Sequence, residues 1–328
     1  MNKFYLTLIF VLFAINGYSQ TFEDYMAEAQ SAADMWDYDE AVQAYDKAQE
    51  MNPGNTEIYS LRAYAKDMNG DRESAVIDYG KAIEFDPTDA GLYYSRAYAR
   101  EYIYDYQGAV EDFTKYLELA GDDADIYSIR ARCLYQLDDY SGAISDYTMS
   151  INIAPDNSEI YYDRAYAYIE VDNFESAIND YMKVLELDPA NPRIPAKIAT
   201  VKVLSGAYEK AIDDCNSMIK EDEGDLEAYF IRGYAKTESG DYESAIADLD
   251  FVIEQYPGLP ESFYYRAVSK FNLNKYGEAL QDFNGAIDLK PDYAEAYYER
   301  AVLKNNMGDE KGAATDFLEA EKLGYIAG

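Results

Sequence analysis

A unit of 34 residues recurs along almost the whole chain, and no other feature of the sequence constrains the fold as strongly. Six prolines mark its phase, because the gaps between them are 34, 68, 34, 68 and 34 residues: Pro53, Pro87, Pro155, Pro189, Pro257 and Pro291. Nine units follow without insertion, and we number them repeats 1 to 9: 22–55, 56–89, 90–123, 124–157, 158–191, 192–225, 226–259, 260–293 and 294–327. A period of this length indicates a solenoid in which each repeat buries its apolar face against its neighbours.

Each repeat is predicted to be a helix–turn–helix hairpin. In the second half of repeat 2, apolar residues recur at three- and four-residue steps, as on one face of a helix: Ala75, Val76, Tyr79, Ala82 and Ile83. Gly70-Asp71 separates this stretch from an earlier helical one around Ile58 and Ala63. Asp86-Pro87 ends it, because proline cannot continue a helix.

Three positions of the repeat carry the expected packing between the two helices. The twentieth is alanine in all nine repeats: Ala41, Ala75, Ala109, Ala143, Ala177, Ala211, Ala245, Ala279 and Ala313. The eighth is alanine or glycine: Ala29, Ala63, Ala97, Ala131, Ala165, Ala199, Gly233, Ala267 and Ala301. Small residues at both places let the helices approach closely. The twenty-fourth position is mostly aromatic and is expected to fill the space beside them: Tyr45, Tyr79, Phe113, Tyr147, Tyr181, Phe283 and Phe317.

This pattern resembles the tetratricopeptide repeat (TPR) family, in which aromatic, small and proline positions recur at these spacings. The family's tryptophan at the fourth position is replaced here by another aromatic: Tyr25, Tyr59, Tyr93, Tyr127, Tyr161, Tyr229, Phe263 and Tyr297. Arginine replaces the family's leucine at the seventh position. The resemblance implies an all-α fold, a right-handed superhelix of nine hairpins whose first helices line a concave groove. It says little about the ligand.

The seventh-position arginines are predicted to pair with aspartates at the twenty-third position. The arginines are Arg62, Arg96, Arg130, Arg164, Arg232, Arg266 and Arg300. The aspartates are Asp78, Asp112, Asp146, Asp180, Asp214, Asp248, Asp282 and Asp316. A partly buried arginine needs a partner, so we expect a ladder of pairs inside the stack. The alternative is that these charges are solvated on outer faces.

The two ends of the array and repeat 6 depart from the pattern. At the twenty-eighth position, apolar in the inner repeats, stand Gln49 in repeat 1 and Glu321 in repeat 9, and at the mostly apolar third position repeat 1 has Asp24. These residues are expected to cap the outer faces of a complete solenoid, although Phe317 and Leu323 would leave an apolar patch that permits a homodimer.

Repeat 6 begins Pro192-Arg193-Ile194-Pro195 and has Ile198 at the arginine position. Since proline is tolerated only in a helix's first turn, we expect a late helix start and either a local change of pitch or a hinge. The alternative is sequence drift within an ordinary hairpin.

The resemblance places the groove near the second, fifth, ninth and twelfth positions of the first helices. Aromatic rings stand at the fifth and ninth: Tyr64, Tyr94, Tyr98, Tyr162, Tyr166, Phe230, Tyr234, Tyr264 and Tyr298. Carboxylates stand at the second: Glu57, Asp125, Glu159, Glu227, Glu261 and Glu295. Tyrosine offers a large contact area and a hydrogen-bonding tip, and a ligand rich in lysine or arginine would add cation–π contacts and ion pairs. The alternative is that individual tyrosines only pack between adjacent first helices.

The formal net charge of −35 narrows the choice of partner, because so acidic a surface repels nucleic acid and anionic membranes. A cationic peptide or basic protein face is favoured, although acidity also keeps a tyrosine-rich surface soluble. The chain has no histidine, which removes histidine-based triads, metal sites and pH switches. No phosphate-binding loop or complete calcium loop is present. We therefore expect no catalytic residues, no metal and no cofactor, and the single tryptophan, Trp36, is interpreted as turn packing.

The first 19 residues resemble a cleavable signal peptide. Lys3 is followed by a nearly continuous apolar run over 4–15, and Gly17 and Ser19 supply the small residues that a signal peptidase reads. The run is short for a membrane span, which needs about 20 residues; an uncleaved anchor is the alternative. The segment is similar to signal peptides of Bacteroidota and predicts a periplasmic or secreted protein. Cys133 and Cys215 are too far apart in the repeat frame to form a disulfide with each other.

Taken together, these features favour a non-enzymatic scaffold that binds a peptide or protein in a tyrosine-rich, acidic groove in the cell envelope. A glycan-binding module is the first alternative, since aromatic faces beside carboxylates also suit sugars. A self-associating assembly subunit is the second.

Overall fold

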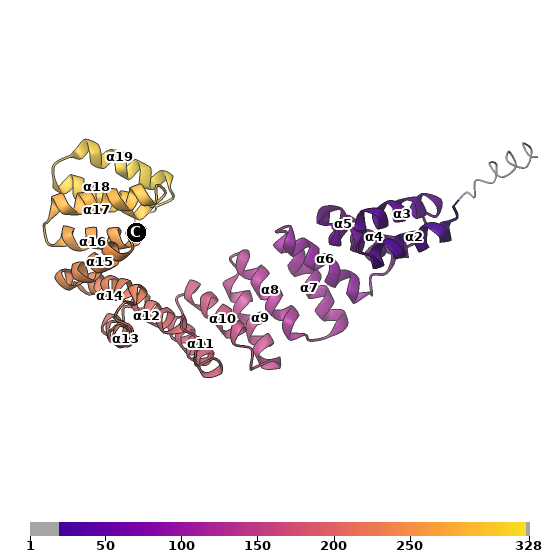
Figure 1. Cartoon of the computed structure of the whole chain (residues 1–328), viewed down its shortest axis with the longest axis horizontal. Coiled ribbons are helices and arrows are strands. Elements are labelled where there is room, and N and C mark those ends of the chain that lie inside the picture. Colours follow the sequence, from indigo (N-terminus) through magenta and orange to yellow (C-terminus); the bar gives the residue numbers. More distant parts are fainter. Residues whose placement is uncertain (1–19, 326–328) are drawn as a thin grey trace, which may run out of the picture. The chain divides into compact units, whose positions relative to one another are not determined.

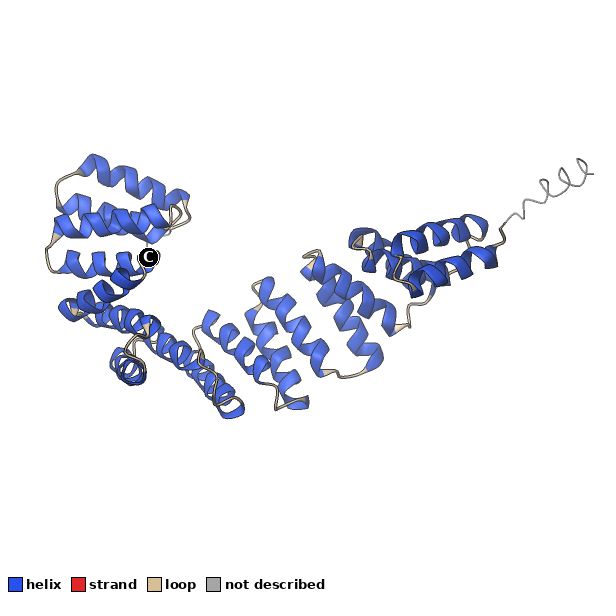
Figure 2. Cartoon of the chain, in the orientation of Figure 1, coloured by secondary structure: helices blue, strands red, loops and turns tan. Residues whose placement is uncertain are grey.

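The computed structural model describes residues 20–325, so the predicted signal peptide, 1–19, lies outside the described residues. The described part holds eighteen helices and no strand (Figure 2). The chain divides into two compact units, 1–155 and 156–328. Within each unit, successive helices lie against one another (Figure 1).

Two helices make up each repeat, as the sequence predicts. Unit 1 contains α2 (Phe22–Asp34), α3 (Tyr38–Met51), α4 (Glu57–Met68), α5 (Arg72–Phe85), α6 (Ala90–Tyr102), α7 (Tyr106–Ala120), α8 (Ala124–Gln136) and α9 (Tyr140–Ile153). Unit 2 contains α10 (Ser158–Glu170), α11 (Phe174–Leu187), α12 (Ile194–Leu204), α13 (Tyr208–Glu221), α14 (Leu226–Ser239), α15 (Tyr242–Gln255), α16 (Pro260–Asn272), α17 (Tyr276–Leu289), α18 (Ala294–Asn306) and α19 (Glu310–Lys322). The all-α solenoid fold of about nine hairpins is therefore confirmed.

The tight turn inside each hairpin depends on a left-handed residue at the fifteenth position. Glycine takes this conformation freely, and it stands there in repeats 2, 6, 7 and 9 as Gly70, Gly206, Gly240 and Gly308. The other repeats have Trp36, Tyr104, Asp138, Asp172 and Asn274, all with positive φ. The next residue is usually an aspartate that caps the second helix, as Asp71 does by accepting from the Ser74 amide. Trp36 is 75% exposed and meets the ring of Tyr38 edge-on at 6.4 Å, so its packing in the turn is limited to one face.

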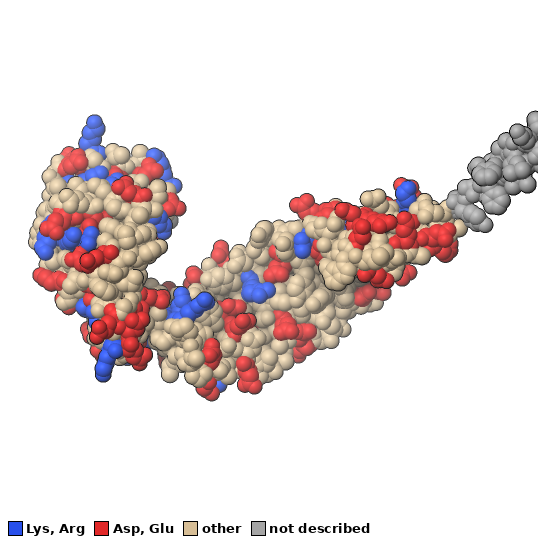
Figure 3. Space-filling model, viewed as in Figure 1, with Lys and Arg blue, Asp and Glu red and all other residues tan. Residues whose placement is uncertain are grey.

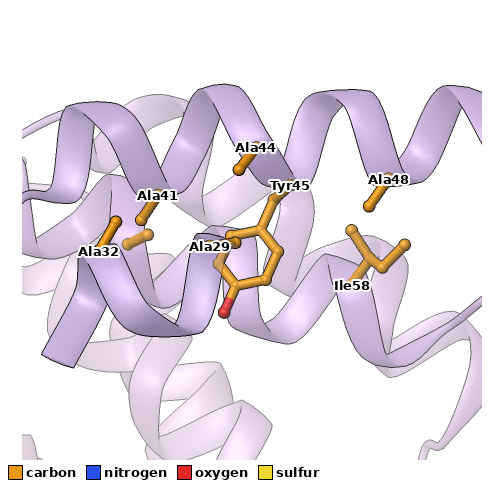
Figure 4. Packing of buried hydrophobic residues seen from close by; sticks show 8 residues of the cluster. Ala29, Ala32, Ala41, Ala44, Tyr45, Ala48 and Ile58 are labelled. Carbon is orange, nitrogen blue, oxygen red and sulfur yellow. The ribbon is translucent and has the colours of Figure 1, made fainter. Parts of the chain in front are cut away.

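The small residues at the eighth and twentieth positions form the centre of each hairpin. In repeat 1, Ala29 and Ala41 are fully buried, and the ring of Tyr45 lies beside them (Figure 4). Repeat 7 has Gly233 where the others have alanine, because a Cβ there would come within 2.8 Å of Leu249 Cγ. The predicted packing of small against bulky residues is confirmed in both units.

The predicted Arg–Asp pairs are present in all seven repeats that have both residues. In each, Nε and Nη2 of the arginine donate to the two carboxylate oxygens of the aspartate sixteen residues later, for example at 2.7 Å in both bonds of Arg62 with Asp78. The Asp78 side chain is only 6% exposed and that of Arg62 only 13%. We call this paired fork the Arg–Asp clamp. The other clamps are Arg96–Asp112, Arg130–Asp146, Arg164–Asp180, Arg232–Asp248, Arg266–Asp282 and Arg300–Asp316.

The structure adds two partners that the sequence reasoning missed. A second cation at the eleventh position also reaches the same aspartate: Lys66, Arg100, Lys236, Lys270 and Lys304. The free Nη1 of the arginine donates backwards to the twenty-fifth residue of the preceding repeat: Arg62 to Asp46, Arg130 to Thr114, Arg232 to Asn216, Arg266 to Asp250 and Arg300 to Asn284. The clamp therefore holds the two helices of one repeat, and in these five repeats it also joins the repeat to its predecessor.

The two ends of the array differ in how they are covered. Asp24 and Glu321 are exposed, as expected of capping residues. Gln49 is not a cap, and that expectation is wrong, because the twenty-eighth position faces the following repeat: Ile83 of repeat 2 packs with Leu92 and Tyr93 of repeat 3. Gln49 is partly buried, and its buried Oε1 has no hydrogen-bond partner in the described part of the chain.

Repeat 6 starts late, as predicted. Its first helix, α12, begins at the third position of the repeat, whereas the first helices of the other repeats begin at the first or second. Asp214 has no arginine in its own repeat and is paired with Lys202 instead, and its side chain is 34% exposed. A hinge at this repeat stays a prediction.

Cys133 and Cys215 are both free and buried, in units 1 and 2 respectively. Within residues 20–325, no helix is long and apolar enough to cross a membrane.

Candidate functional site

The candidate residues lie on the first helices of their repeats, where one turn separates the second, fifth and ninth positions. Unit 1 holds Glu57 and Tyr64 on α4, Tyr94 and Tyr98 on α6, and Asp125 on α8. Unit 2 holds Glu159, Tyr162 and Tyr166 on α10, Glu227, Phe230 and Tyr234 on α14, Glu261 and Tyr264 on α16, and Glu295 and Tyr298 on α18.

Rings at the fifth and ninth positions contact each other, because residues four apart share one helix face. The ring centroids of Tyr94 and Tyr98 are 4.7 Å apart. Those of Tyr162 and Tyr166 are 5.1 Å apart, and their hydroxyl oxygens are 3.1 Å apart. Burial is the main cause that raises the pKa of Tyr162 to about 12, with the Tyr166 hydrogen bond adding to it. The Tyr162 hydroxyl therefore stays protonated at neutral pH.

One aromatic cluster in unit 2 joins two first helices. Tyr265, which the sequence reasoning missed, stacks on Tyr234 with centroids 4.3 Å apart and lies 6.0 Å from Phe230. Tyr265 is at the sixth position, which is aromatic in no other repeat, so no repeated signal marked it. The cluster presents partly buried rings from repeats 7 and 8 side by side.

Tyr264 and Tyr298 pack against other aromatic rings of the chain. Tyr264 packs against Phe283 and Tyr293, with centroids 6.1 and 5.1 Å away. Burial raises the pKa of Tyr264, and the nearby Glu299 carboxylate adds to the shift. Tyr298 stacks on Tyr325 at 4.5 Å. These partners lie on a second helix, in a link and after α19, not on an adjacent first helix, and a binding role for both rings stays a prediction.

Two of the predicted rings are freely accessible. Tyr64 is 50% exposed and Tyr94 is 39% exposed. Tyr64 meets the ring of Tyr38 edge-on, and Tyr94 lies against Tyr116. Both offer an aromatic surface on unit 1.

The six predicted carboxylates all lie in the first turn of a helix. A carboxylate there stabilises the helix, because it faces the partial positive charge of the helix start. Glu261 is partly buried and the other five are exposed. None of the six forms an ion pair within the described residues.

Three hollows in the described surface occupy equivalent places in repeats 2, 5 and 7. Each lies between the start of the first helix, the end of the second helix and the link to the next repeat. The repeat-2 hollow, about 430 Å³, is lined by Thr56, Glu57, Ser60, Ala82, Phe85, Asp86, Asp89 and Leu92. The repeat-5 hollow, about 310 Å³, is lined by Ser158, Glu159, Tyr162, Asp163, Val184, Asn191 and Arg193. The repeat-7 hollow, about 330 Å³, is lined by Leu226, Glu227, Phe230, Val252, Tyr256, Leu259 and Glu261.

The hollows bring second- and fifth-position residues together, with Glu159 beside Tyr162 and Glu227 beside Phe230. The ninth-position rings do not line them. Figure 3 shows many acidic side chains on the surface over α2 to α5 in unit 1. Within residues 20–325, no group of three or more acidic, cysteine or histidine side chains is arranged to hold a metal ion.

Comparison with protein families matches these hairpins. Tetratricopeptide repeat models match residues 26–90, 94–158, 158–191 and 227–258, and a TPR repeat model matches residues 269–308. The chain belongs to the tetratricopeptide repeat family. No curated protein shows a significant sequence match to this TPR chain.

Several solved structures resemble the TPR chain. The structure of Naa15/Naa10 bound to HypK-THB aligns with a TM-score of 0.53 at 13% identity, covering 92% of this chain and 63% of that one, which shows the shared fold. Yeast Tom70 aligns with a TM-score of 0.48 at 15% identity, over 93% and 92% of the two chains. YrrB, described as a TPR protein with an unusual peptide-binding site, aligns with a TM-score of 0.41 at 25% identity, over 58% of this chain and 99% of its own.

Proposed function

We propose that this TPR protein is a non-catalytic scaffold of the cell envelope that binds a basic peptide or protein through the aromatic and acidic faces of its first helices. The TPR fold and its relatives support protein–protein interaction as the general role. The observation that carries the basic character of the partner is that six first-turn carboxylates have no ion pair in the described chain.

The aromatic clusters supply the contact surface for the partner, and the carboxylates would orient the partner on that surface. Tyr166 and Tyr234 are partly buried rings held by neighbouring rings, and they lose little conformational freedom when a ligand binds. Carboxylates nearby would attract cationic partners and speed association. The predicted signal peptide supports a location in the periplasm or outside the cell. The predicted homodimer through repeat 9 remains a proposal that size measurements at several concentrations would test.

The test is capture of proteins from envelope extract on the immobilised protein, at low and at high salt. We expect a basic protein to be retained at low salt and released at high salt. The variant Tyr166→Ala/Tyr234→Ala should weaken its binding by about thirtyfold or more, because a single hot-spot residue contributes about 2 kcal/mol. Tyr104→Asn is the matched control, since it removes an exposed tyrosine from a turn where asparagine also adopts positive φ.

Retention that is equal for the double variant and the control would refute the assigned surface. Retention on a glycan array without any captured protein would favour the glycan-binding alternative and overturn the proposed function.

A further inference from the structure

We propose that the repeat-7 hollow binds a long basic side chain, lysine or arginine, of the partner. This inference rests on the proposed function for its source of ligand, but it concerns one defined place on unit 2. The hollow's volume of about 330 Å³ is at the lower end of small-ligand pockets, which begin near 300 Å³.

The floor of the hollow suits the aliphatic stem of such a side chain. Val252 is 1% exposed, and Leu226, Leu259 and the ring of Phe230 line the hollow with it. Lysine and arginine bury their methylene stems along apolar surface while the charged head stays at the polar rim. An uncharged apolar side chain would use the same floor but not the rim.

The rim carries an aromatic wall. Tyr256 follows the end of α15, and its ring lies over Gly258, where an added Cβ would stand 3.4 Å from the ring atoms. The Tyr256 ring therefore rests against the link at van der Waals distance. A cation at the mouth of the hollow can lie over this ring face or that of Phe230.

The charge of the rim selects a cation. Glu227 and Glu261 come from the successive first helices α14 and α16 and line the same hollow. Neither has an ion-pair partner among residues 20–325, and no basic residue lines the hollow. Each helix start contributes only about half a positive charge. The two full carboxylate charges therefore leave the hollow negative.

The repeat-5 hollow supplies an internal comparison for the occupant. Arg193 stands there at the second position of the following repeat, the place that Glu261 occupies in the repeat-7 hollow. Its guanidinium lies near enough to Tyr162 to lower the pKa of that hydroxyl, against the larger raising effect of burial. The chain thus already places a basic side chain beside Glu159 in one copy of the hollow and leaves another copy without one.

The test is a methyl NMR titration of the purified protein with blocked lysine (Nα-acetyl-lysine methylamide). Leucine and valine methyl labels report on the hollow directly through Leu226, Val252 and Leu259, and on the repeat-5 hollow through Val184. We expect saturable shifts at the first three with lysine, and binding of blocked norleucine that is about five- to tenfold weaker, because norleucine lacks the charge. The Val184 methyls should not respond. Equal binding of lysine and norleucine, or no saturable shift at the three methyls, would overturn the inference.

Two exchange variants give an independent readout. Glu261→Arg imitates repeat 5 and should abolish the lysine-dependent shifts at Val252. Arg193→Glu imitates repeat 7 and should create lysine-dependent shifts at Val184. If the exchange leaves both patterns unchanged, the charge of the second position does not select the ligand and the inference is wrong.

The inference and the proposed function can fail separately. A captured partner that binds wild type and Glu227→Gln/Glu261→Gln equally well, while Tyr166→Ala/Tyr234→Ala loses it, would overturn the hollow and leave the scaffold. Saturable lysine binding without any captured partner would support the inference that the hollow binds a basic side chain, and it would refute the proposed function.

Discussion

Repeats 8 and 6 both have an aspartate at the twenty-third position but pair it with different partners. In repeat 8, Asp282 accepts two hydrogen bonds from Arg266 and one from Lys270, and its side chain is 7% exposed. In repeat 6, Asp214 has only Lys202 and its side chain is 34% exposed. The second helix therefore keeps its aspartate in both repeats, but only the arginine seals it from solvent.

The difference extends to the neighbouring repeat. Arg266 also donates to Asp250 of repeat 7 at 2.6 Å. Before repeat 6 the equivalent position is Met182, and the arginine position is Ile198. Both partners have been replaced by apolar residues, a change that costs little because neither leaves a buried polar group unpaired. Repeat 6 thus shows that the arginine and its backward acceptor can be lost together while the aspartate stays. Substitutions of single partners in the other repeats test what each partner contributes.

Arg266→Ala should have the largest effect, lowering the free energy of unfolding by about 3 kcal/mol, because it removes both hydrogen bonds of the fork from the buried carboxylate of Asp282 and leaves it with Lys270 alone. Lys202→Ala in repeat 6 is the matched control and should cost less than about 1 kcal/mol, since Asp214 can be solvated. Chemical denaturation followed by circular dichroism gives both values. Similar costs would show that burial of the aspartate is irrelevant.

Asp316→Asn tests the clamp through pH. Burial alone would raise the pKa of Asp316, but hydrogen bonds from Arg300 and Lys304 outweigh it and lower the pKa below its ordinary value. The stabilisation is therefore complete above the unfolded value near 3.9 and is lost as the pH falls through the folded pKa. At pH 7 the variant should be about 2 kcal/mol less stable than wild type, a gap that closes toward pH 2. A gap that is the same at pH 7 and pH 2 would contradict this account.

Ile198→Arg should bring repeat 6 closer to repeat 8. A fork from the seventh position can reach Asp214 as it does in the other clamps, which should raise the free energy of unfolding by about 1 kcal/mol. Ile198→Lys is the control and should gain less, because an ammonium cannot donate in a bidentate fork. Hydrogen exchange of α12 and α13 amides would localise the gain. If hydrogen exchange slows in neither variant, a basic residue at position 198 does not pair with Asp214.

Asp250→Ala should have the smallest effect, about 0.5 kcal/mol, because the Asp250 side chain is 54% exposed and solvent competes for the Arg266 fork. The clamp with Asp282 stays intact in this variant. Asp46→Ala, which removes the corresponding link to Arg62 in unit 1, should cost a similar amount. A loss as large as that of Arg266→Ala would place the main strength of the clamp between repeats rather than within them.

The parts of the fold that repeat in residue type could be predicted from the sequence. Alanine recurs at the position of Ala41, and arginine and aspartate recur at the positions of Arg62 and Asp78. Burial and charge pairing therefore select the same residue type in many repeats. The twenty-fifth position gives no such mark, because Asp46, Thr114 and Asn216 serve equally well as acceptors and the residue type varies. The eleventh-position cations do recur, and their spacing from the aspartates was a signal that could have been used.

The predictions fail in two situations. One is where the pattern does not show which neighbouring repeat a position faces, and the other is where a residue type occurs in only one repeat. A pattern of apolar residues does not say which neighbour a position faces, and Gln49 was therefore assigned to the wrong side of repeat 1. Tyr265 and Tyr293 are aromatic in one repeat each at their positions, so repetition could not reveal the cluster around Tyr234 and Tyr264. The hollows depend on how helix ends and links meet, which spacing alone does not determine.

The backward hydrogen bonds of Arg62, Arg130, Arg232, Arg266 and Arg300 limit which repeats could be excised. Removing repeat 8 would place Arg300 after Asp250, and removing repeat 7 would place Arg266 after Asn216, so either shortened chain would offer the arginine an acceptor. Removing repeat 6 would place Arg232 after Met182, whose thioether accepts only weakly. Each of these hairpins is thus matched to the repeat that precedes it, because its arginine needs an acceptor there. The order of the repeats therefore matters as well as their common length.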